Sequence, residues 1–187
     1  MINPLQIDAR LPWLLPALLS LVAIFVLSIA WISELYGANL QLFDNRNLNP
    51  CQLCIVQRYP YALIVVLGAA ATLLSNRAME RTLLLSVISI VLVFGSYVSG
   101  FHIGVEYGWW TAGSACSAPI APLDLSQEVF TLSTDSAPPP NCSDAAWRFP
   151  GDNGLSMAGY NFILSTVMAT GVSFFALASL NRLPRDS

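Results

Sequence analysis

Four long apolar segments, separated by polar or proline-rich stretches, set the organisation of the chain. They cover about 12–33, 55–74, 82–105 and 155–180, and the only formally charged side chain within them is Arg58. An α-helix of about 20 apolar residues crosses a hydrocarbon core of about 30 Å. The pattern therefore predicts an all-α integral membrane protein, a four-helix bundle that forms a single membrane domain over residues 1–187.

Composition agrees with a membrane protein. The chain is 55% hydrophobic and only 10% charged, whereas soluble domains are about 25% charged. A secretory signal peptide is the alternative for the first segment, but its apolar run is longer than usual and no convincing small-x-small cleavage site follows. In the last segment, Gly159, Gly171, Ala176 and several serines and threonines favour close helix packing.

The two longer connections, about 34–54 and 106–152, contain all four cysteines. Because successive connections alternate sides, these two predicted loops lie on the same side of the membrane. Leu125, Val129 and Leu132 recur at helical spacing in the second loop. This spacing predicts either a short amphipathic helix on the bilayer surface or an irregular loop.

The arginines indicate the orientation in the membrane. Five of the eight fall on the side of the termini and of the 75–81 turn: Arg10, Arg77, Arg81, Arg182 and Arg185. By the positive-inside rule both termini are cytoplasmic. The cysteines then face an exoplasmic compartment, where disulfides persist. The net charge of −3 argues against a nucleic-acid partner, which requires a basic patch.

A Cys-x-x-Cys pair, Cys51 and Cys54, stands at the start of the second apolar segment. Asn49 is the expected helix N-cap, Pro50 suits the first turn, and Gln52 suits a capping box. Both sulfurs then lie in or near the first helical turn, where the macrodipole and free N–H groups lower cysteine pKa values. The pattern favours thiol–disulfide exchange.

Arg58 follows Cys54 by four residues, on the same face of the expected helix. A charge at membrane depth costs about 2.5–3.5 kcal/mol on insertion scales, which makes Arg58 a candidate functional residue. It would stabilise the Cys54 thiolate and an anionic reduced acceptor; the alternative is a side chain that snorkels to the interface. Pro60 removes a helical bond to the Val56 carbonyl and predicts a bend near Arg58.

Cys116 and Cys142 form the second pair, in the longer predicted loop. A disulfide between them would stabilise the fold by about 3–4 kcal/mol in the chain-entropy model, so a purely structural bridge is one interpretation. With a Cys-x-x-Cys pair on the same side, disulfide relay through a proline-rich loop is the better one. No metal site is predicted, because structural zinc sites usually combine two such pairs and this chain has one, with a single histidine.

His102 and Glu106 stand four residues apart at the end of the third segment. They are candidates to handle protons for a two-electron, two-proton acceptor. Alternatively, they form a boundary pair that hydrogen-bonds internally. Trp109 and Trp110 suit an interfacial aromatic belt better than a cofactor platform.

These motifs together resemble the DsbB family of membrane disulfide-generating oxidoreductases. The first part of the resemblance consists of Pro50-Cys51-Gln52-Leu53-Cys54 with Arg58-Tyr59, then His102-Ile103-Gly104-Val105-Glu106 with Trp109. It continues through Cys116, Cys142, Trp147-Arg148-Phe149 and Leu155-Ser156-Met157-Ala158. The resemblance thus covers nearly the whole chain, although Gly151-Asp152-Asn153-Gly154 looks slightly longer than usual.

The resemblance implies an enzyme of the bacterial inner membrane that reoxidises a DsbA-like, thioredoxin-fold dithiol protein in the periplasm. The partner would form a mixed disulfide with Cys116, and electrons would pass through Cys142 to Cys51. Cys54 would then pass them to a membrane quinone, ubiquinone or menaquinone. Arg58, His102 and Glu106 are the implied quinone-binding residues. A strongly oxidising partner can be reoxidised only by a stronger acceptor, which a quinone is.

Two alternatives use the same pattern differently. A vitamin-K-epoxide-reductase-like enzyme would share the chemistry, but that family places its Cys-x-x-Cys pair after the loop pair. A non-enzymatic membrane assembly subunit would use the cysteines as structural disulfides, but it would have no need for Arg58 one turn beyond Cys54.

Overall fold

The computed structural model describes residues 11–36, 50–73, 78–113, 116, 141–145, 147–151 and 153–181. This part consists of α1 (Leu11–Tyr36), α2 (Gln52–Val56), α3 (Arg58–Leu73), α4 (Ala78–Glu106), β1 (Arg148–Phe149), β2 (Leu155–Ser156) and α5 (Met157–Leu180). Within it, four stretches are long and apolar enough to cross a membrane: Leu14–Ser33, Gln52–Leu73, Met79–Glu106 and Met157–Leu180. The predicted all-α four-helix bundle is confirmed.

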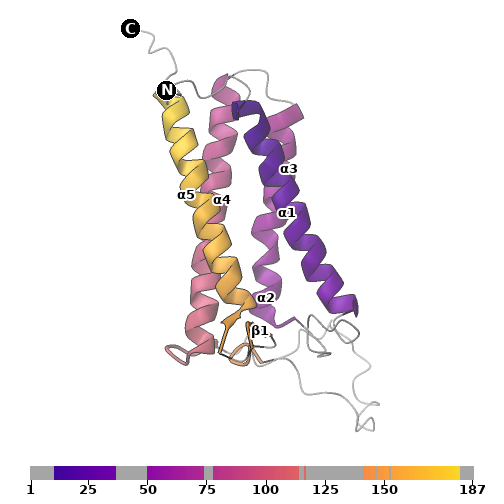
Figure 1. The fold of residues 1–187 in the computed structure, drawn as a ribbon. Helices are drawn as coiled ribbons and strands as arrows, with labels where there is room; N and C mark the ends of the chain where they lie inside the picture. The colour runs from indigo at the N-terminus through magenta and orange to yellow at the C-terminus, as the bar shows by residue number, and fades with distance from the viewer. Residues whose placement is uncertain are drawn as a thin grey trace, which may run out of the picture.

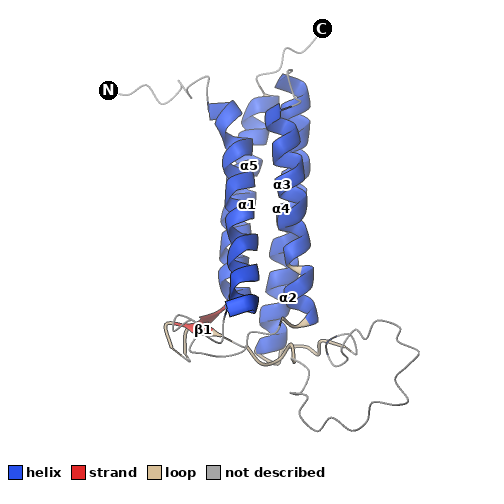
Figure 2. Ribbon diagram, turned by 90° about the vertical axis from the view of Figure 1, so that its right-hand side faces the viewer, coloured by secondary structure: helices blue, strands red, loops and turns tan. Residues whose placement is uncertain are grey.

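The four long helices run along a common axis, as two views at right angles show (Figure 1 and Figure 2). α1 packs against α3, α3 against α4, and α4 against α5. α1 begins and α5 ends at one end of the bundle, whereas α2 and the β1–β2 hairpin lie at the other (Figure 1). We name this second end, which carries Cys51, Cys116 and Cys142, the cysteine end.

Aliphatic side chains fill the interior between the helices. Ile64, Ile88, Leu92 and Val172 are buried in one cluster. Large apolar side chains also cover the outside of the bundle: Leu21, Phe25, Val66, Ile90, Val167 and Phe174 are all more than half exposed. A helix of a soluble bundle carries polar residues on its outer face. An outer surface that is apolar therefore suits contact with lipid tails.

Small residues allow α1 and α3 to approach closely. A Cβ atom at Gly68 would lie 2.2 Å from Ser20 Oγ and 2.8 Å from the carbonyl oxygen of Pro16. Between α4 and α5, the hydroxyl oxygens of Ser89 and Ser173 lie 2.6 Å apart. Close backbone approach and interhelical hydrogen bonds are the main forces between helices in lipid, where the hydrophobic effect does not act.

The predicted packing function of the α5 glycines is wrong. A Cβ atom at Gly171 would have no neighbour within 4 Å among the described residues, and one at Gly159 would meet side chains of its own N-terminal turn. Ala176 is buried, as predicted. The α4–α5 contact also relies on hydroxyl side chains, because Thr166 and Ser96 hydrogen-bond at 2.7 Å as Ser89 and Ser173 do.

A short hairpin leads into α5 at the cysteine end. Its antiparallel register pairs Phe149 with Leu155. Ser156 is the N-cap of α5, and its Oγ accepts a hydrogen bond of 3.2 Å from the N–H of Gly159. The Tyr160 hydroxyl donates to the Phe149 carbonyl oxygen at 3.0 Å. The hairpin is thereby attached to the first turn of α5.

Two boundaries differ from the sequence prediction. α4 begins at Ala78, so Arg81 lies in a helix and is buried, rather than in the predicted 75–81 turn. α1 continues to Tyr36, into the predicted loop. The 125–132 segment and the other arginines used to predict the orientation (Arg10, Arg77, Arg182 and Arg185) lie outside the described residues.

Replacing Gly68 by alanine is expected to destabilise the bundle, because the new methyl group would collide with Ser20 and with the Pro16 backbone. The expected loss is about 1–3 kcal/mol in free energy of unfolding, the usual cost of overpacking. Reversible unfolding in mixed micelles measures it. Gly171→Ala is the matched control, since that position is open. Equal stability of the two variants would show that the α1–α3 contact does not need Gly68.

Candidate functional site

Cys51, and not Asn49, caps the helix that carries the Cys-x-x-Cys pair. α2 begins at Gln52, and Cys51 is its N-cap, with φ −72° and ψ 168°. The Cys51 sulfur accepts a hydrogen bond of 3.3 Å from the backbone N–H of Cys54. Both sulfurs do lie at the first helical turn, where free N–H groups and the helix dipole stabilise negative charge. The predicted capping residue is wrong because sulfur itself takes the cap.

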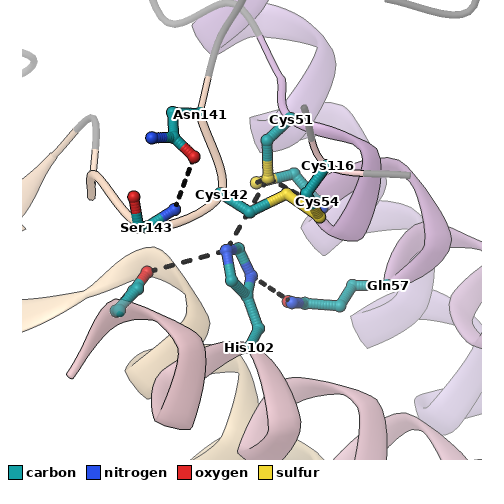
Figure 3. Close-up of a disulfide and its surroundings, with 9 residues drawn as sticks. Cys51, Cys54, Gln57, His102, Cys116, Asn141, Cys142 and Ser143 are labelled. Carbon is teal, nitrogen blue, oxygen red and sulfur yellow. Dashed lines mark hydrogen bonds and ion pairs between the residues drawn. A yellow bond between two sulfur atoms is a disulfide. The ribbon is translucent and has the colours of Figure 1, made fainter. Parts of the chain in front are cut away.

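The two sulfurs lie together beside His102 (Figure 3). Cys51 Sγ is 2.8 Å from Cys54 Sγ and 3.6 Å from His102 Nε2, and neither cysteine belongs to a disulfide. Cys51 is buried and Cys54 is half-buried. The site is therefore a dithiol with an imidazole nitrogen within hydrogen-bond reach of one sulfur.

The surroundings of Cys51 stabilise its thiolate. The pKa of the Cys51 thiol is lowered from 9.0 to about 4. The hydrogen bond from the Cys54 side chain is the largest cause, and His102 acts in the same direction, whereas burial raises the pKa. The sequence predicted lowered pKa values for both cysteines of the pair, with Arg58 stabilising the Cys54 thiolate in addition. The tertiary structure instead surrounds Cys51 with the hydrogen-bond donors.

Cys116 and Cys142 form a disulfide, with Cα atoms 5.6 Å apart. The disulfide packs in one buried cluster with Cys51 and Val105, and Cys54 lies against this cluster. Figure 3 shows the disulfide next to the Cys51–Cys54 pair. The structure thus brings all four cysteines to one place at the cysteine end.

Arg58 is the first residue of α3. α2 ends at Val56, and its C-cap, Gln57, keeps a helical conformation. The bend predicted near Arg58 is therefore a break between α2 and α3, which are separated only by Gln57. Pro60, in the first turn of α3, has no N–H to offer the Val56 carbonyl. Arg58 is close enough to act electrostatically on the Cys54 sulfur.

His102 and Glu106 form a buried pair on α4. His102 Nε2 lies 3.9 Å from Glu106 Oε1, and both side chains are 4% exposed. His102 makes its hydrogen bonds to Cys51 and Gln57. Glu106 Oε2 has no hydrogen-bond partner in the part of the chain that the structure describes. His102 therefore hydrogen-bonds to Cys51, while its distance to Glu106 is that of an ion pair and too long for a hydrogen bond.

A chain of buried amide and hydroxyl groups joins His102 to α5. His102 Nδ1 lies 2.7 Å from Gln57 Nε2. Asn161 Nδ2 donates to Gln57 Oε1 at 2.8 Å and to Ser99 Oγ at 2.7 Å. The Tyr61 hydroxyl donates to Asn161 Oδ1. The imidazole is thus held from three helices and from the α2–α3 break.

These partners of His102 were not predicted as site residues from the sequence. Polar side chains inside apolar spans are costly and are functional candidates by default. Gln57 and Asn161 carried that signal, because each is an amide within or beside a long apolar run. Tyr61 and Ser99 did not, because tyrosines and serines are common in membrane helices for packing reasons alone.

The sulfurs of Cys51 and Cys54 and the imidazole of His102 are also potential metal ligands, since their ligand atoms lie within 4.8 Å of one another. A structural zinc site takes four protein ligands. This group supplies three, one fewer than such a site needs. Its hydrogen bonds suit a thiol and its thiolate.

An apolar groove of about 650 Å³ runs between α1 and α3. Its lining residues are Ile24, Leu27, Ser28, Trp31, Ile32, Leu35, Ala62 and Val65. Ala62 lies one helical turn after Arg58, and Val65 follows on the same face of α3. Trp31 and Leu35 on the other wall are exposed on the outside of the bundle. The groove therefore begins one turn from Arg58 and opens on the lipid-facing surface.

Residues 9–175 match the family described as Disulfide bond formation protein DsbB. The chain belongs to the DsbB family. Disulfide bond formation protein B of Xylella fastidiosa (strain Temecula1) is 29% identical over 146 residues, which are 75% of this chain and 82% of that protein. An uncharacterized protein of Rickettsia prowazekii (strain Madrid E) is 29% identical over 145 residues, 77% of this chain and 76% of that protein.

Disulfide bond formation protein B of Xanthomonas oryzae pv. oryzae (strain MAFF 311018) is 27% identical over 160 residues, covering 81% of this chain and 84% of that protein. No solved structure matches the chain. Membership of the DsbB family, together with the four membrane-spanning stretches, makes this a multi-pass membrane oxidoreductase of disulfide bond formation.

Titration of the reduced protein tests the Cys51 thiolate. Because the pKa of Cys51 is lowered to about 4, its thiolate absorbance is present at neutral pH and is lost only as the pH falls through about 4. Cys54→Ala removes the hydrogen bond that lowers the pKa of Cys51 most. The pH midpoint of Cys51 thiolate absorbance is therefore expected to rise by about one unit or more. Ultraviolet absorbance measures it, with Cys51→Ala as the background. A wild-type midpoint near 9.0, the ordinary value, would contradict the stabilised thiolate.

Proposed function

We propose that this DsbB-family protein reoxidises a DsbA-like, thioredoxin-fold dithiol protein and passes the electrons through its two cysteine pairs to a membrane quinone. The observation that carries the proposal is the packing of the Cys116–Cys142 disulfide against the Cys51–Cys54 pair in one cluster. Each exchange requires a thiolate to attack a disulfide sulfur directly. Two pairs in contact satisfy this requirement.

The partner exchanges with the Cys116–Cys142 disulfide. One partner thiolate attacks Cys116, the bond to Cys142 breaks, and a mixed disulfide forms. The second partner thiol displaces Cys116, which leaves the partner oxidised. Cys116 and Cys142 then hold the two electrons as a dithiol, and the two protons of the partner's thiols are carried by these sulfurs or released to water.

Internal exchange then moves the electrons to the membrane edge. The Cys142 thiolate attacks Cys51 of a Cys51–Cys54 disulfide, and Cys54 leaves. Cys116 attacks Cys142, the Cys116–Cys142 disulfide reforms, and Cys51 leaves. The lowered pKa of Cys51 makes it a good leaving group. The products, a closed loop disulfide and two free thiols, have the connectivity of the structure.

A quinone, when bound, accepts two electrons and two protons from the Cys51–Cys54 dithiol, so that a quinol and the disulfide result. The apolar groove between α1 and α3 has a volume typical of ligand sites and suits an isoprenoid tail. Arg58, one turn from that groove, provides positive charge for an anionic reduced ring. His102 and Glu106 are the titratable groups on α4 that can hold protons beside the sulfurs.

We assign the cysteine end to the periplasm of a bacterial inner membrane, with both termini in the cytoplasm. The excess of arginines in the terminal segments and near the 75–81 turn, on the opposite side of the membrane from the cysteines, supports this orientation. Disulfide exchange of the Cys116–Cys142 pair also requires an oxidising compartment.

Anaerobic turnover tests the proposal. Purified protein, a reduced thioredoxin-fold partner and either ubiquinone or menaquinone are mixed, and quinol is followed spectroscopically. One quinol is expected per partner disulfide, and Cys54→Ser is expected to abolish quinol formation because the electrons then have no exit. Full activity of that variant would remove the relay.

Arg58→Ala refines the same experiment. Loss of a charged hydrogen-bond donor costs about 1.5–3 kcal/mol, so the quinone KM is expected to rise by about tenfold or more. Arg148→Ala is the matched control, because Arg148 lies in the β1–β2 hairpin and contacts Gly154 and Tyr107. Equal quinone kinetics for both variants would refute the function assigned to Arg58.

A trapping experiment tests the entry point of the electrons. A reduced partner variant with only its attacking cysteine is expected to form a mixed disulfide with the wild-type protein, whose Cys116–Cys142 disulfide it opens. The single variants lack this disulfide, so the partner is supplied to them as a mixed disulfide with an aromatic thiol, which the remaining loop thiolate displaces. A stable partner complex is expected with Cys142→Ser but not with Cys116→Ser. Non-reducing electrophoresis detects the product. A trap formed by Cys116→Ser, and lost in Cys142→Ser, would reassign the attacked sulfur.

A further inference from the structure

We propose that Asn161 is a positioning residue which, through Gln57, fixes His102 as its Nε2–H tautomer, so that the imidazole proton points at Cys51. The use of this proton in electron relay rests on the proposed function above. The tautomer itself follows from hydrogen-bond geometry alone, in four steps.

The backbone of α4 fixes the direction in which the Ser99 hydroxyl donates its proton. The Ser99 hydroxyl donates its only proton to the Gly95 carbonyl oxygen at 2.8 Å. The Ser99 oxygen can therefore only accept from its other neighbour. That neighbour is Asn161, 2.7 Å away. The Asn161 group that faces Ser99 must be the NH₂ group.

The groups around the oxygen of the Asn161 amide give the same orientation. Its Oδ1 accepts from the Tyr61 hydroxyl, and the Ser165 hydroxyl lies 3.4 Å from the same oxygen. Two hydroxyl donors on one side and one acceptor on the other leave a single consistent orientation of the amide.

The third step passes the orientation to Gln57. The NH₂ group of Asn161 also lies 2.8 Å from Gln57, so Gln57 must present its carbonyl oxygen to Asn161. The NH₂ group of Gln57 then faces His102 Nδ1 at 2.7 Å. An amide NH₂ group only donates, so Nδ1 must accept. The single proton of the neutral ring is therefore on Nε2.

The fourth step is the target of that proton. Nε2 lies 3.6 Å from Cys51 Sγ and 3.9 Å from Glu106 Oε1. Within the described residues, the titratable groups that act on Cys51 are Cys54 from α2 and His102 from α4. Glu106 lies beyond the imidazole, and the Cys116–Cys142 disulfide does not titrate. With the other tautomer, a ring lone pair would face the Cys51 thiolate and two donors would face each other at Gln57.

The network is effective because it is buried among helices. Ser99 and His102 are both almost completely buried, and hydrogen bonds are stronger where water is excluded. Asn161 touches neither sulfur, and its influence reaches Cys51 only through Gln57 and His102. This separation makes Asn161 a positioning residue and distinguishes it from the groups that take part in exchange.

Nitrogen-15 NMR of histidine-labelled protein tests the tautomer directly. The chain has one histidine, so the spectrum contains a single imidazole, and the shifts of its two ring nitrogens identify which one is protonated. The wild-type protein is expected to show Nε2–H. Asn161→Leu and Gln57→Leu are each expected to give a mixture of tautomers. A wild-type Nδ1–H tautomer, or an unchanged Nε2–H signal in both variants, would overturn the proposal.

A second readout follows the effect on Cys51. When the imidazole no longer points a fixed proton at the thiolate, Cys51 loses a hydrogen-bond donor. The pH midpoint of Cys51 thiolate absorbance is therefore expected to rise by about one unit in Asn161→Leu. Ser173→Ala is the matched control, because it removes a comparable α4–α5 hydrogen bond away from His102. An equal rise in both variants would indicate a general packing effect and overturn the positioning function.

Both readouts use the full-length protein without quinone or partner. A fixed Nε2–H tautomer in a protein that reduces no quinone would refute the proposed function and leave this inference intact. Normal quinone reduction by a wild-type protein whose His102 is a mixture of tautomers would refute this inference and leave the proposed function intact. If Asn161→Leu does not fold, the wild-type spectrum and Gln57→Leu still decide the question.

Discussion

The N-terminus of α2 needs hydrogen-bond acceptors for its free backbone N–H groups, and the Cys51 sulfur is one of them. This one interaction orients the cysteine pair and places a sulfur at the positive end of a helix, where a thiolate is stable. The Cys54 side chain and His102 add further hydrogen bonds to the same sulfur. These hydrogen bonds distinguish Cys51 from Cys54, and the disulfide distinguishes Cys116 and Cys142 from both.

The bundle supports this site by a polar network in a region where polar groups are expensive. Gln57, Ser99, His102 and Asn161 satisfy one another across the α2–α3 break, α4 and α5. In a dry interior, a network of this kind rigidifies its members when every group has a partner. Glu106 Oε2 lacks such a partner within the described part of the chain. The other oxygen of this carboxylate, Oε1, lies 3.9 Å from His102 Nε2.

Two further features lie at this end of the fold: the loop disulfide beside Cys51, and a groove that begins near Arg58. The Cys116–Cys142 disulfide packs against Cys51. The groove between α1 and α3 begins one turn after Arg58 and is lined almost entirely by apolar side chains. The close α1–α3 contact at Gly68 holds the two walls of this groove together farther along the bundle.

The sequence alone determined the four spans, because each long apolar run must bury its backbone in a helix to cross lipid. It also identified both cysteine pairs and the polar residues His102 and Glu106. The cap at Cys51 is a local hydrogen bond that the sequence pattern did not indicate. Only the tertiary structure decided that Cys51 carries the stabilised thiolate and that α5 does not pack through Gly171. The thiolate depends on the contact of Cys51 with His102, 51 positions away, and His102 is held through Gln57 and Asn161 across 45 and 104 positions. Local spacing cannot report which distant side chain completes a hydrogen bond, because that depends on how the helices pack.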